Sequence, residues 1–217
     1  MKIGFNFVGI SYEKDKRDWR IEKEAFKKQV IDCWDNSNNK IIKLTTYKQY
    51  STHNNNLNES ARWYNPTIDE LLDFFKPKDL LLLNVENSSQ IKTFLQSLLL
   101  WEFEDVDFIV CSRFDIKYNV PVNNNVDLNK INFLFREGKW WTERRYICDN
   151  FFIIPKKFLE SFTKAMHLHL KKNSWDCINI HPIYNYLLFF LDENNFHFMY
   201  NDMNSYSHHN PYYTLLR

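Results

Sequence analysis

The stretch DLLLLNVENSSQIKTFLQSLLLWEFEDVDFIVCSR, residues 79–113, decides the fold class. It opens with a short, continuous apolar run at 79–85, which is typical of a buried parallel strand. An amphipathic helix capped by one of two serines is expected over 88–103, followed by a second buried strand over 106–113. Two buried strands joined by a helix predict parallel pairing within one sheet.

The preceding sequence repeats this alternation. Strands are expected over 2–10 and 40–47, with a surface helix between them in 14–34. A further helix before 79–113 begins with Thr67 and Glu70, the spacing of a capping box. Strands that alternate with helices predict an α/β fold with a mostly parallel central sheet and helices on both faces.

The second half of the sequence predicts strands and helices without the regular alternation of the first half. Strand-like runs at 131–137 and 146–155 are separated by GKWWTERR, which has the composition of a polar loop. A helix is expected over 156–170, a second helix begins at Pro182, and a last strand is expected over 196–202. No internal repeat and no long linker interrupts the sequence, which favours one domain.

Composition narrows the class of protein. The 217 residues are 44% hydrophobic and 18% aromatic, enough for a substantial core, and only 3 are glycine, so the glycine-rich phosphate loops are missing. The net charge of +1, with acids and bases interspersed, argues against a nucleic-acid partner. Four cysteines without a C-x-x-C pair, no signal peptide and no transmembrane segment predict a cytoplasmic protein, bacterial or, if viral, in the host cytoplasm.

The strand at 106–113 ends in charged residues. Arg113 and Asp115 are two residues apart, so in extended chain their side chains point the same way. The carboxyl edge of an open α/β sheet is where ligands bind, and a carboxylate there suits a hard divalent cation. Arg113 either grips a phosphate as a bidentate fork or pairs with Asp115 itself.

These residues resemble a known family. The segment at 105–116 resembles the strand that carries the D-x-D motif in nucleotide-sugar glycosyltransferases of the GT-A fold, and 140–162 resembles a segment of bacterial and viral members. The resemblance implies a GT-A-like three-layer α/β/α sandwich, with 1–217 as one domain, 1–118 as the nucleotide-binding half and 119–217 as the acceptor-binding half. It implies transfer of a sugar from a UDP- or GDP-sugar to a hydroxyl of a glycan, lipid-linked or protein acceptor, assisted by Mn²⁺ or Mg²⁺.

The resemblance also implies roles for individual residues. Asp115 matches the second, metal-binding Asp of the motif, whereas Arg113 stands where the first Asp is expected, a departure from the pattern. His208 is implied as a further metal ligand near the C-terminus. Asp149 is expected to be the catalytic base of an inverting enzyme, with Asn150 hydrogen-bonding the sugar.

The remaining candidates are placed by their positions in the chain. Ser11, Arg17 and Asn84 follow or end strands at the carboxyl edge and are expected to meet the nucleotide or its diphosphate. Trp140 and Trp141 are expected to stack on the sugar or the acceptor, because aromatic faces pack on sugar rings.

Two other functions fit the same sequence. The Arg113 departure allows a non-catalytic carbohydrate- or protein-binding domain of degenerate transferase type. Asp115, Glu137 and Lys139 also match the spacing of a metal-dependent nuclease. The balanced charge counts against the nuclease, since binding to DNA relies on basic side chains at the phosphates.

Overall fold

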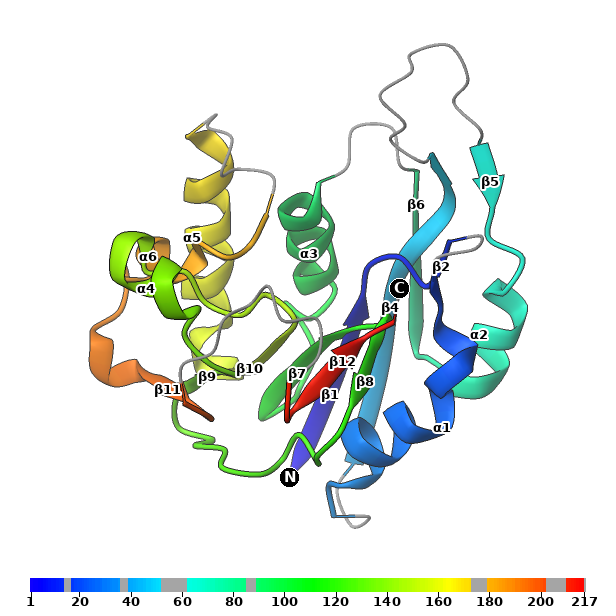
Figure 1. Ribbon diagram of the computed structural model, residues 1–217, viewed down its shortest axis with the longest axis horizontal. Helices are drawn as coiled ribbons and strands as arrows, with labels where there is room; N and C mark the ends of the chain where they lie inside the picture. Colours follow the sequence, from blue (N-terminus) through cyan, green and yellow to red (C-terminus); the bar gives the residue numbers. More distant parts are fainter. Residues whose placement is uncertain are drawn as a thin grey trace.

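The structure, a computed structural model, describes residues 1–13, 17–35, 39–51, 62–84, 89–172, 179–201 and 210–216 (Figure 1). Within these residues an eight-stranded sheet forms the centre of the molecule. Its strands are β1 (Lys2–Val8), β4 (Asn39–Ser51), β5 (Arg62–Tyr64), β6 (Asp79–Asn84), β7 (Phe108–Arg113), β9 (Ile131–Phe133), β10 (Phe151–Pro155) and β11 (Phe196–Phe198).

The sheet has the order β11-β9-β10-β7-β1-β4-β5, with β6 also paired to β4. Its middle, β6-β4-β1-β7, is parallel, whereas β10 joins β7 in antiparallel register. Helices connect the parallel strands, which confirms the predicted α/β class. The connecting helices are η1 (Trp19–Glu22), α1 (Lys23–Phe26) and the π-helical η2 (Lys27–Asp32) after β1, α2 (Ile68–Phe75) after β5, and α3 (Gln90–Leu99) after β6.

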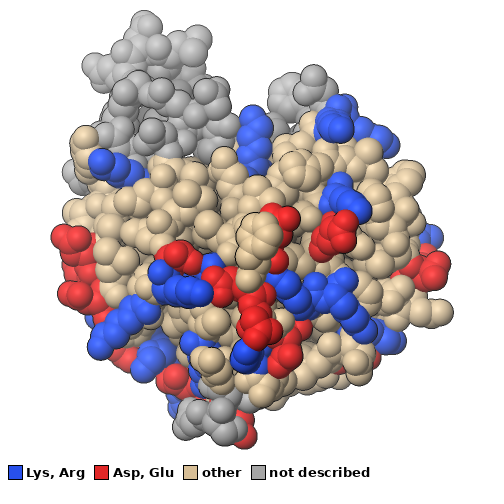
Figure 2. Space-filling view, turned by 180° about the vertical axis from the view of Figure 1, so that it is seen from behind, with Lys and Arg blue, Asp and Glu red and all other residues tan. Residues whose placement is uncertain are grey.

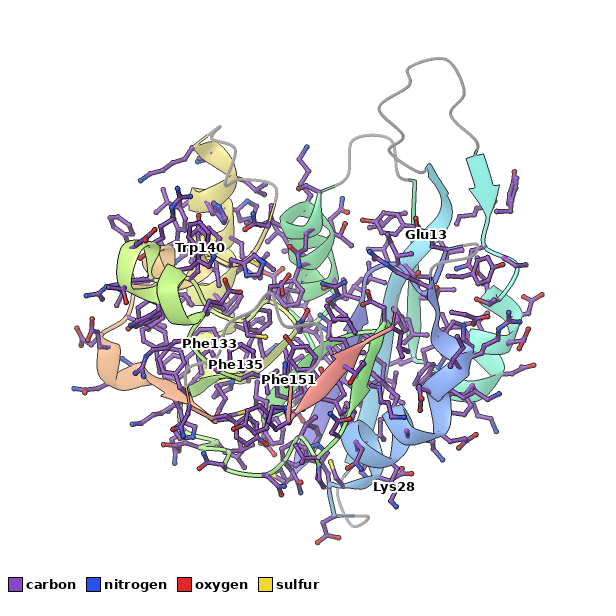
Figure 3. The ribbon with its side chains drawn as sticks, viewed as in Figure 1. Glu13, Lys28, Phe133, Phe135, Trp140 and Phe151 are labelled. Atoms are coloured by element: carbon purple, nitrogen blue, oxygen red, sulfur yellow. The ribbon has the colours of Figure 1, made fainter. Side chains whose placement is uncertain are left out.

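Two hydrophobic layers hold the helices onto the two faces of the sheet. Successive strand residues point to opposite faces, so Phe152 packs with α3 and α5 (Leu159–Lys171), whereas its neighbour Phe151 belongs to the other layer with α1 and α2. Figure 3 shows Phe133, Phe135 and Phe151 in the interior of the molecule. The helices α3, α5 and α6 (Ile183–Leu187) cover one face, which gives a three-layer α/β/α sandwich.

The second half departs from the sequence prediction. The expected polar loop GKWWTERR is a helix, α4 (Gly138–Arg144), which ends where Arg145 adopts a left-handed backbone with φ 51°. Among the strands that were not expected, β8 (Ile116–Tyr118) and β12 (Tyr213–Leu215) pair antiparallel outside the central sheet. The remaining elements are short: β2 (Tyr12–Glu13), β3 (Arg17–Asp18), η3 (Lys156–Phe158) and η5 (Glu193–Asn195).

The predicted capping box at the start of α2 is wrong. The Thr67 hydroxyl donates to Asn65 Oδ1 at 2.7 Å and accepts from Trp19 Nε1 at 3.0 Å, so it does not cap the helix. Glu70 pairs with Arg20 instead, at 2.8 Å. The threonine therefore fixes the loop before α2 to the helical segment after β1.

The surface seen in Figure 2 carries basic and acidic side chains side by side, in line with the near-zero net charge. No helix in the described part of the chain is long and apolar enough to cross a membrane.

Candidate functional site

A cavity of about 310 Å³ opens at the point where the strand order reverses. It lies at the carboxyl ends of β1 and β7, which are adjacent, with Val8 opposite Arg113 in the parallel register. Open α/β sheets bind ligands at this switch point, because the chain leaves the two strands in opposite directions there. The lining residues are Val8, Gly9, Ile10, Arg17, Tyr47, Gln90, Thr93, Phe94, Cys111, Ser112, Arg113, Asp149, Asn150, Phe152 and Ile180.

Two backbone features shape this cavity. Gly9 turns the chain away from β1 with φ 117°, a backbone conformation that residues with a side chain rarely adopt. Its N–H donates to the Thr45 carbonyl at 3.0 Å. The helix α3 begins at the cavity wall, with Gln90 and Thr93 among the lining residues, and Ser89 caps it by accepting from the Lys92 N–H at 3.3 Å. The partial positive charge of this helix end favours an anion in the cavity.

Arg113 and Asp115 form a bidentate ion pair, one of the two alternatives that the sequence left open. Arg113 Nε donates to Asp115 Oδ1 at 2.9 Å and Nη2 to Oδ2 at 2.6 Å. The third nitrogen, Nη1, donates to Asn150 Oδ1 at 3.2 Å and lies 3.7 Å from Asp149 Oδ2. Burial disfavours the guanidinium charge, but the two aspartates outweigh it and raise the pKa of Arg113 above its ordinary value.

Asp149 is surrounded by donors that all approach Oδ2. Gln90 Nε2 donates to it, Arg113 lies beside it, and His181 Nε2 is 3.6 Å away. Burial opposes ionisation, but the positive charges of His181 and Arg113 hold the pKa of Asp149 below its ordinary value. Asp149 is therefore a carboxylate at neutral pH.

His181 is the site residue that sequence reasoning missed, because a histidine before a proline at a helix start resembles a cap or surface residue. In the structure its Nε2 faces Asp149, while Nδ1 forms an ion pair with Glu137 and lies 3.1 Å from the Ile147 carbonyl. Burial lowers the pKa of His181, but the two carboxylates more than compensate and raise it to about 9. His181 is thus an imidazolium at neutral pH.

The cavity brings four of the predicted residues together. Arg17, Arg113, Asp149 and Asn150 all line it, although they come from β3, β7 and the segment before β10. Ser11 does not line it: the residue is 1% exposed, and its hydroxyl hydrogen-bonds to Thr46 and Asn65 within the fold.

The two tryptophans lie elsewhere. Trp141 packs edge-on against Tyr184 and Phe198 at ring distances of 4.9 and 5.3 Å, and neither it nor Trp140 lines the cavity. Figure 3 shows Trp140 on α4, on the opposite side of the molecule from Glu13. Their predicted sugar-stacking role stays a prediction.

Three of the remaining predicted residues lie wholly or partly outside the described part of the chain. Asn84 ends β6, but its side chain lies outside the described part of the chain, as do the side chain of Lys139 and the whole of His208. Glu137, the second acid of the nuclease alternative, faces His181 rather than Asp115.

The metal site implied by the resemblance does not fit the residues as arranged. Both oxygens of Asp115 are held by Arg113, and Arg17 Nη1 lies 3.5 Å from Oδ2. Across the described residues, no group of three His, Cys, Asp or Glu side chains is placed to hold a metal ion. The Mn²⁺ or Mg²⁺ requirement stays a prediction.

Comparison with known proteins identifies solved structures with a similar fold. The sequence matches no protein-family model, and a search of curated proteins found no match. Among solved structures, the apo structure of the bifunctional glycosyltransferase WbbM superposes with a TM-score of 0.50 at 11% identity, over 91% of this chain and 38% of that one. The chain has a GT-A-like fold.

A second solved structure, a nucleoside-diphosphate-sugar pyrophosphorylase from Vibrio cholerae RC9, matches with a TM-score of 0.48 at 14% identity, over 90% of each chain. At these identities the likeness shows the fold alone.

Proposed function

We propose that the protein is a nucleotide-sugar-dependent glycosyltransferase, whose donor diphosphate binds in the cavity between β1 and β7. The observation that carries this proposal is the convergence of Arg17, Arg113 and the N-terminus of α3 on one cavity at the strand switch point. Guanidinium groups and helix N-termini both favour a bound phosphate. A volume of about 310 Å³ suits the diphosphate and the adjoining sugar, with the rest of the donor in the open mouth.

The sugar is proposed to lie against Asp149 and Asn150, which adjoin the arginines in the lining. Asn150 is 4% exposed, and its side-chain oxygen is held by Arg113, so its orientation is fixed before a ligand arrives. Amide and carboxylate groups fixed in this way hydrogen-bond sugar hydroxyls at little entropic cost.

In an inverting transfer, the acceptor oxygen forms a bond to the anomeric carbon while the bond from that carbon to the diphosphate oxygen breaks. The bonding electrons leave with the diphosphate, beside Arg17 and Arg113, and the hydroxyl proton passes to Asp149. Because the pKa of Asp149 is below its ordinary value, it is a weak base in the resting site. We propose that it takes the proton only as the new bond makes the hydroxyl acidic.

The test is turnover of a panel of UDP-, GDP- and ADP-sugars by the full chain, read as release of the nucleotide with and without acceptor sugars. We expect release from one donor class, with at least about a tenfold loss in Arg113→Gln. Arg145→Gln is the matched control, because Arg145 forms an exposed ion pair with Glu193 at 2.8 Å, remote from the lining. Donor binding without turnover would favour the non-catalytic binding domain, and no binding would refute the proposal.

Asp149→Asn distinguishes a catalytic base from a residue that only orients the sugar. If this residue takes the proton, kcat falls by about 100-fold or more, the range of general-base catalysis, while KM for the donor changes little. A rise in KM at unchanged kcat would show that Asp149 only orients the sugar.

A further inference from the structure

Seven side chains of alternating charge run along the cavity and behind it; we call this set the ion chain. It begins at β2, one of whose residues, Glu13, is labelled in Figure 3, and ends at the residue before α4. Its order is Glu13, Arg17, Asp115, Arg113, Asp149, His181 and Glu137, with contacts of 3.5, 3.5, 2.6, 3.7 and 3.6 Å and a closer last pair.

Asp115 stands inside the ion chain, between the two arginines. Its side chain is 4% exposed, and its two oxygens meet Arg113 in the fork-to-fork geometry that gives the strongest carboxylate pairing. A divalent cation bound to Asp115 would have to displace this guanidinium, whose side chain is 21% exposed, and leave it beside a second positive charge. Such like-charge contact in a half-buried site is unfavourable.

Arg17 is held more loosely than Arg113. Its contacts to Glu13 and Asp115 are both 3.5 Å long, beyond the 2.7–2.9 Å typical of charge-assisted hydrogen bonds. Its side chain is 23% exposed and lines the cavity. A bound anion therefore gains hydrogen bonds from Arg17 without breaking short ones.

The charges that line the cavity also favour an anion. They are Arg17, Arg113 and Asp149, with one positive charge in excess, and the start of α3 adds a partial positive charge. The other four members of the ion chain are absent from the lining and stand behind it. The surface offered to a ligand is thus more positive than the ion chain as a whole.

We infer that the cavity binds the diphosphate of its ligand through Arg17 and Arg113 without a divalent cation, and that Asp115 is a positioning residue that holds the two guanidinium groups. This inference rests on the proposed function, because it takes the ligand to be a nucleotide diphosphate. It assigns Asp115 a role different from the metal-binding one that the resemblance implies.

The test is isothermal titration of the full chain with UDP, GDP and ADP, in EDTA and then in excess Mn²⁺ or Mg²⁺. We expect one nucleotide to bind with dissociation constants that agree within about threefold in the two conditions. Arg17→Gln should weaken binding by about tenfold or more in both, the effect of losing a charged hydrogen bond. Because Arg17 is part-exposed and loosely held, this variant should fold.

Asp115→Asn distinguishes a positioning residue from a metal ligand. If Asp115 is a positioning residue, its replacement should reduce affinity by the same factor in EDTA and in Mn²⁺. If it is a metal ligand, the replacement should reduce only the additional affinity that the metal gives. Asp105→Asn is the control, since Asp105 precedes β7 at the far edge of the sheet, 87% exposed. Melting temperatures of all variants establish that they are folded.

The outcomes separate the two proposals. Equal affinity in EDTA and in metal supports the inference. Binding that needs Mn²⁺ or Mg²⁺ overturns it and leaves the proposed function standing. Failure of every nucleotide diphosphate in both conditions overturns both.

Discussion

His181 makes a pH-dependent contribution to folding that can be calculated from the structure. In the folded protein its pKa is about 9, against an ordinary value of 6.5, because Asp149 and Glu137 flank the ring. The folded state therefore holds the proton more tightly than the unfolded state. The contribution is complete below pH 6.5, falls as the pH rises, and is lost above pH 9. The difference between the two pKa values corresponds to about 3 kcal/mol.

The assay is urea unfolding of the wild type and His181→Gln at pH 6 and at pH 9.5. At pH 6 the variant should be less stable by about 3 kcal/mol, and by more if the two carboxylates are left without a counter-charge. At pH 9.5 the difference should shrink to less than about 1 kcal/mol, because the wild-type ring is then mostly neutral.

His167→Gln is the matched control, since His167 is exposed on α5. Its stability should follow the wild type at both pH values. A stability difference between wild type and His181→Gln that is the same at pH 6 and pH 9.5 would refute the reasoning, because it would mean that His181 acts by packing rather than by charge.

Three further predictions concern the fold. Gly4→Ala should lower the free energy of unfolding by about 1–3 kcal/mol, because a Cβ would lie 2.5 Å from the Trp101 ring. A urea midpoint equal to that of the wild type would contradict this, and adding Trp101→Leu should relieve the clash. Asn65→Ala should lower the free energy of unfolding by about 1–3 kcal/mol, because it leaves the buried Thr67 N–H and hydroxyl without their acceptor; Asn65→Asp, which keeps an acceptor there, should lose less. Tyr213→Ala should lower it by about 3–5 kcal/mol, because the ring is 1% exposed in the core; a loss below 1 kcal/mol would mean that β12 is not docked in solution.

The parallel half of the sheet could be predicted from sequence because its signals are local. The apolar run of β6 and the amphipathic pattern of α3 each lie within one element, and their alternation fixes the fold class. The strands β8 and β12 have three residues each, too few to show a period, and they pair across about a hundred residues of chain. Only the tertiary fold determines such a pairing.

The same distinction explains which parts of the site were foreseen. Arg113 and Asp115 are two residues apart, so their pairing could be offered from the sequence as one of two alternatives. His181 joins Asp149 across thirty-two positions, at the start of α6, and nothing near it in the sequence marks it as charged. The helix α4 was missed because its one well-packed aromatic side chain, Trp141, gives no periodic pattern.

The ion chain is better explained by binding than by stability. Replacing buried ion pairs with apolar side chains of similar size is often neutral or stabilising, so seven buried or half-buried charges are a poor way to hold a fold together. Three of them line the cavity, and the other four fix the orientation of those three. Groups oriented before the ligand arrives lose little freedom on binding, and this is the advantage that offsets the desolvation of the charges. If so, replacing Glu137 with Gln, behind the cavity, should weaken nucleotide binding through His181 and Asp149 without touching the ligand. Titration with the preferred nucleotide diphosphate measures this, and an unchanged affinity would mean that Glu137 only stabilises the fold.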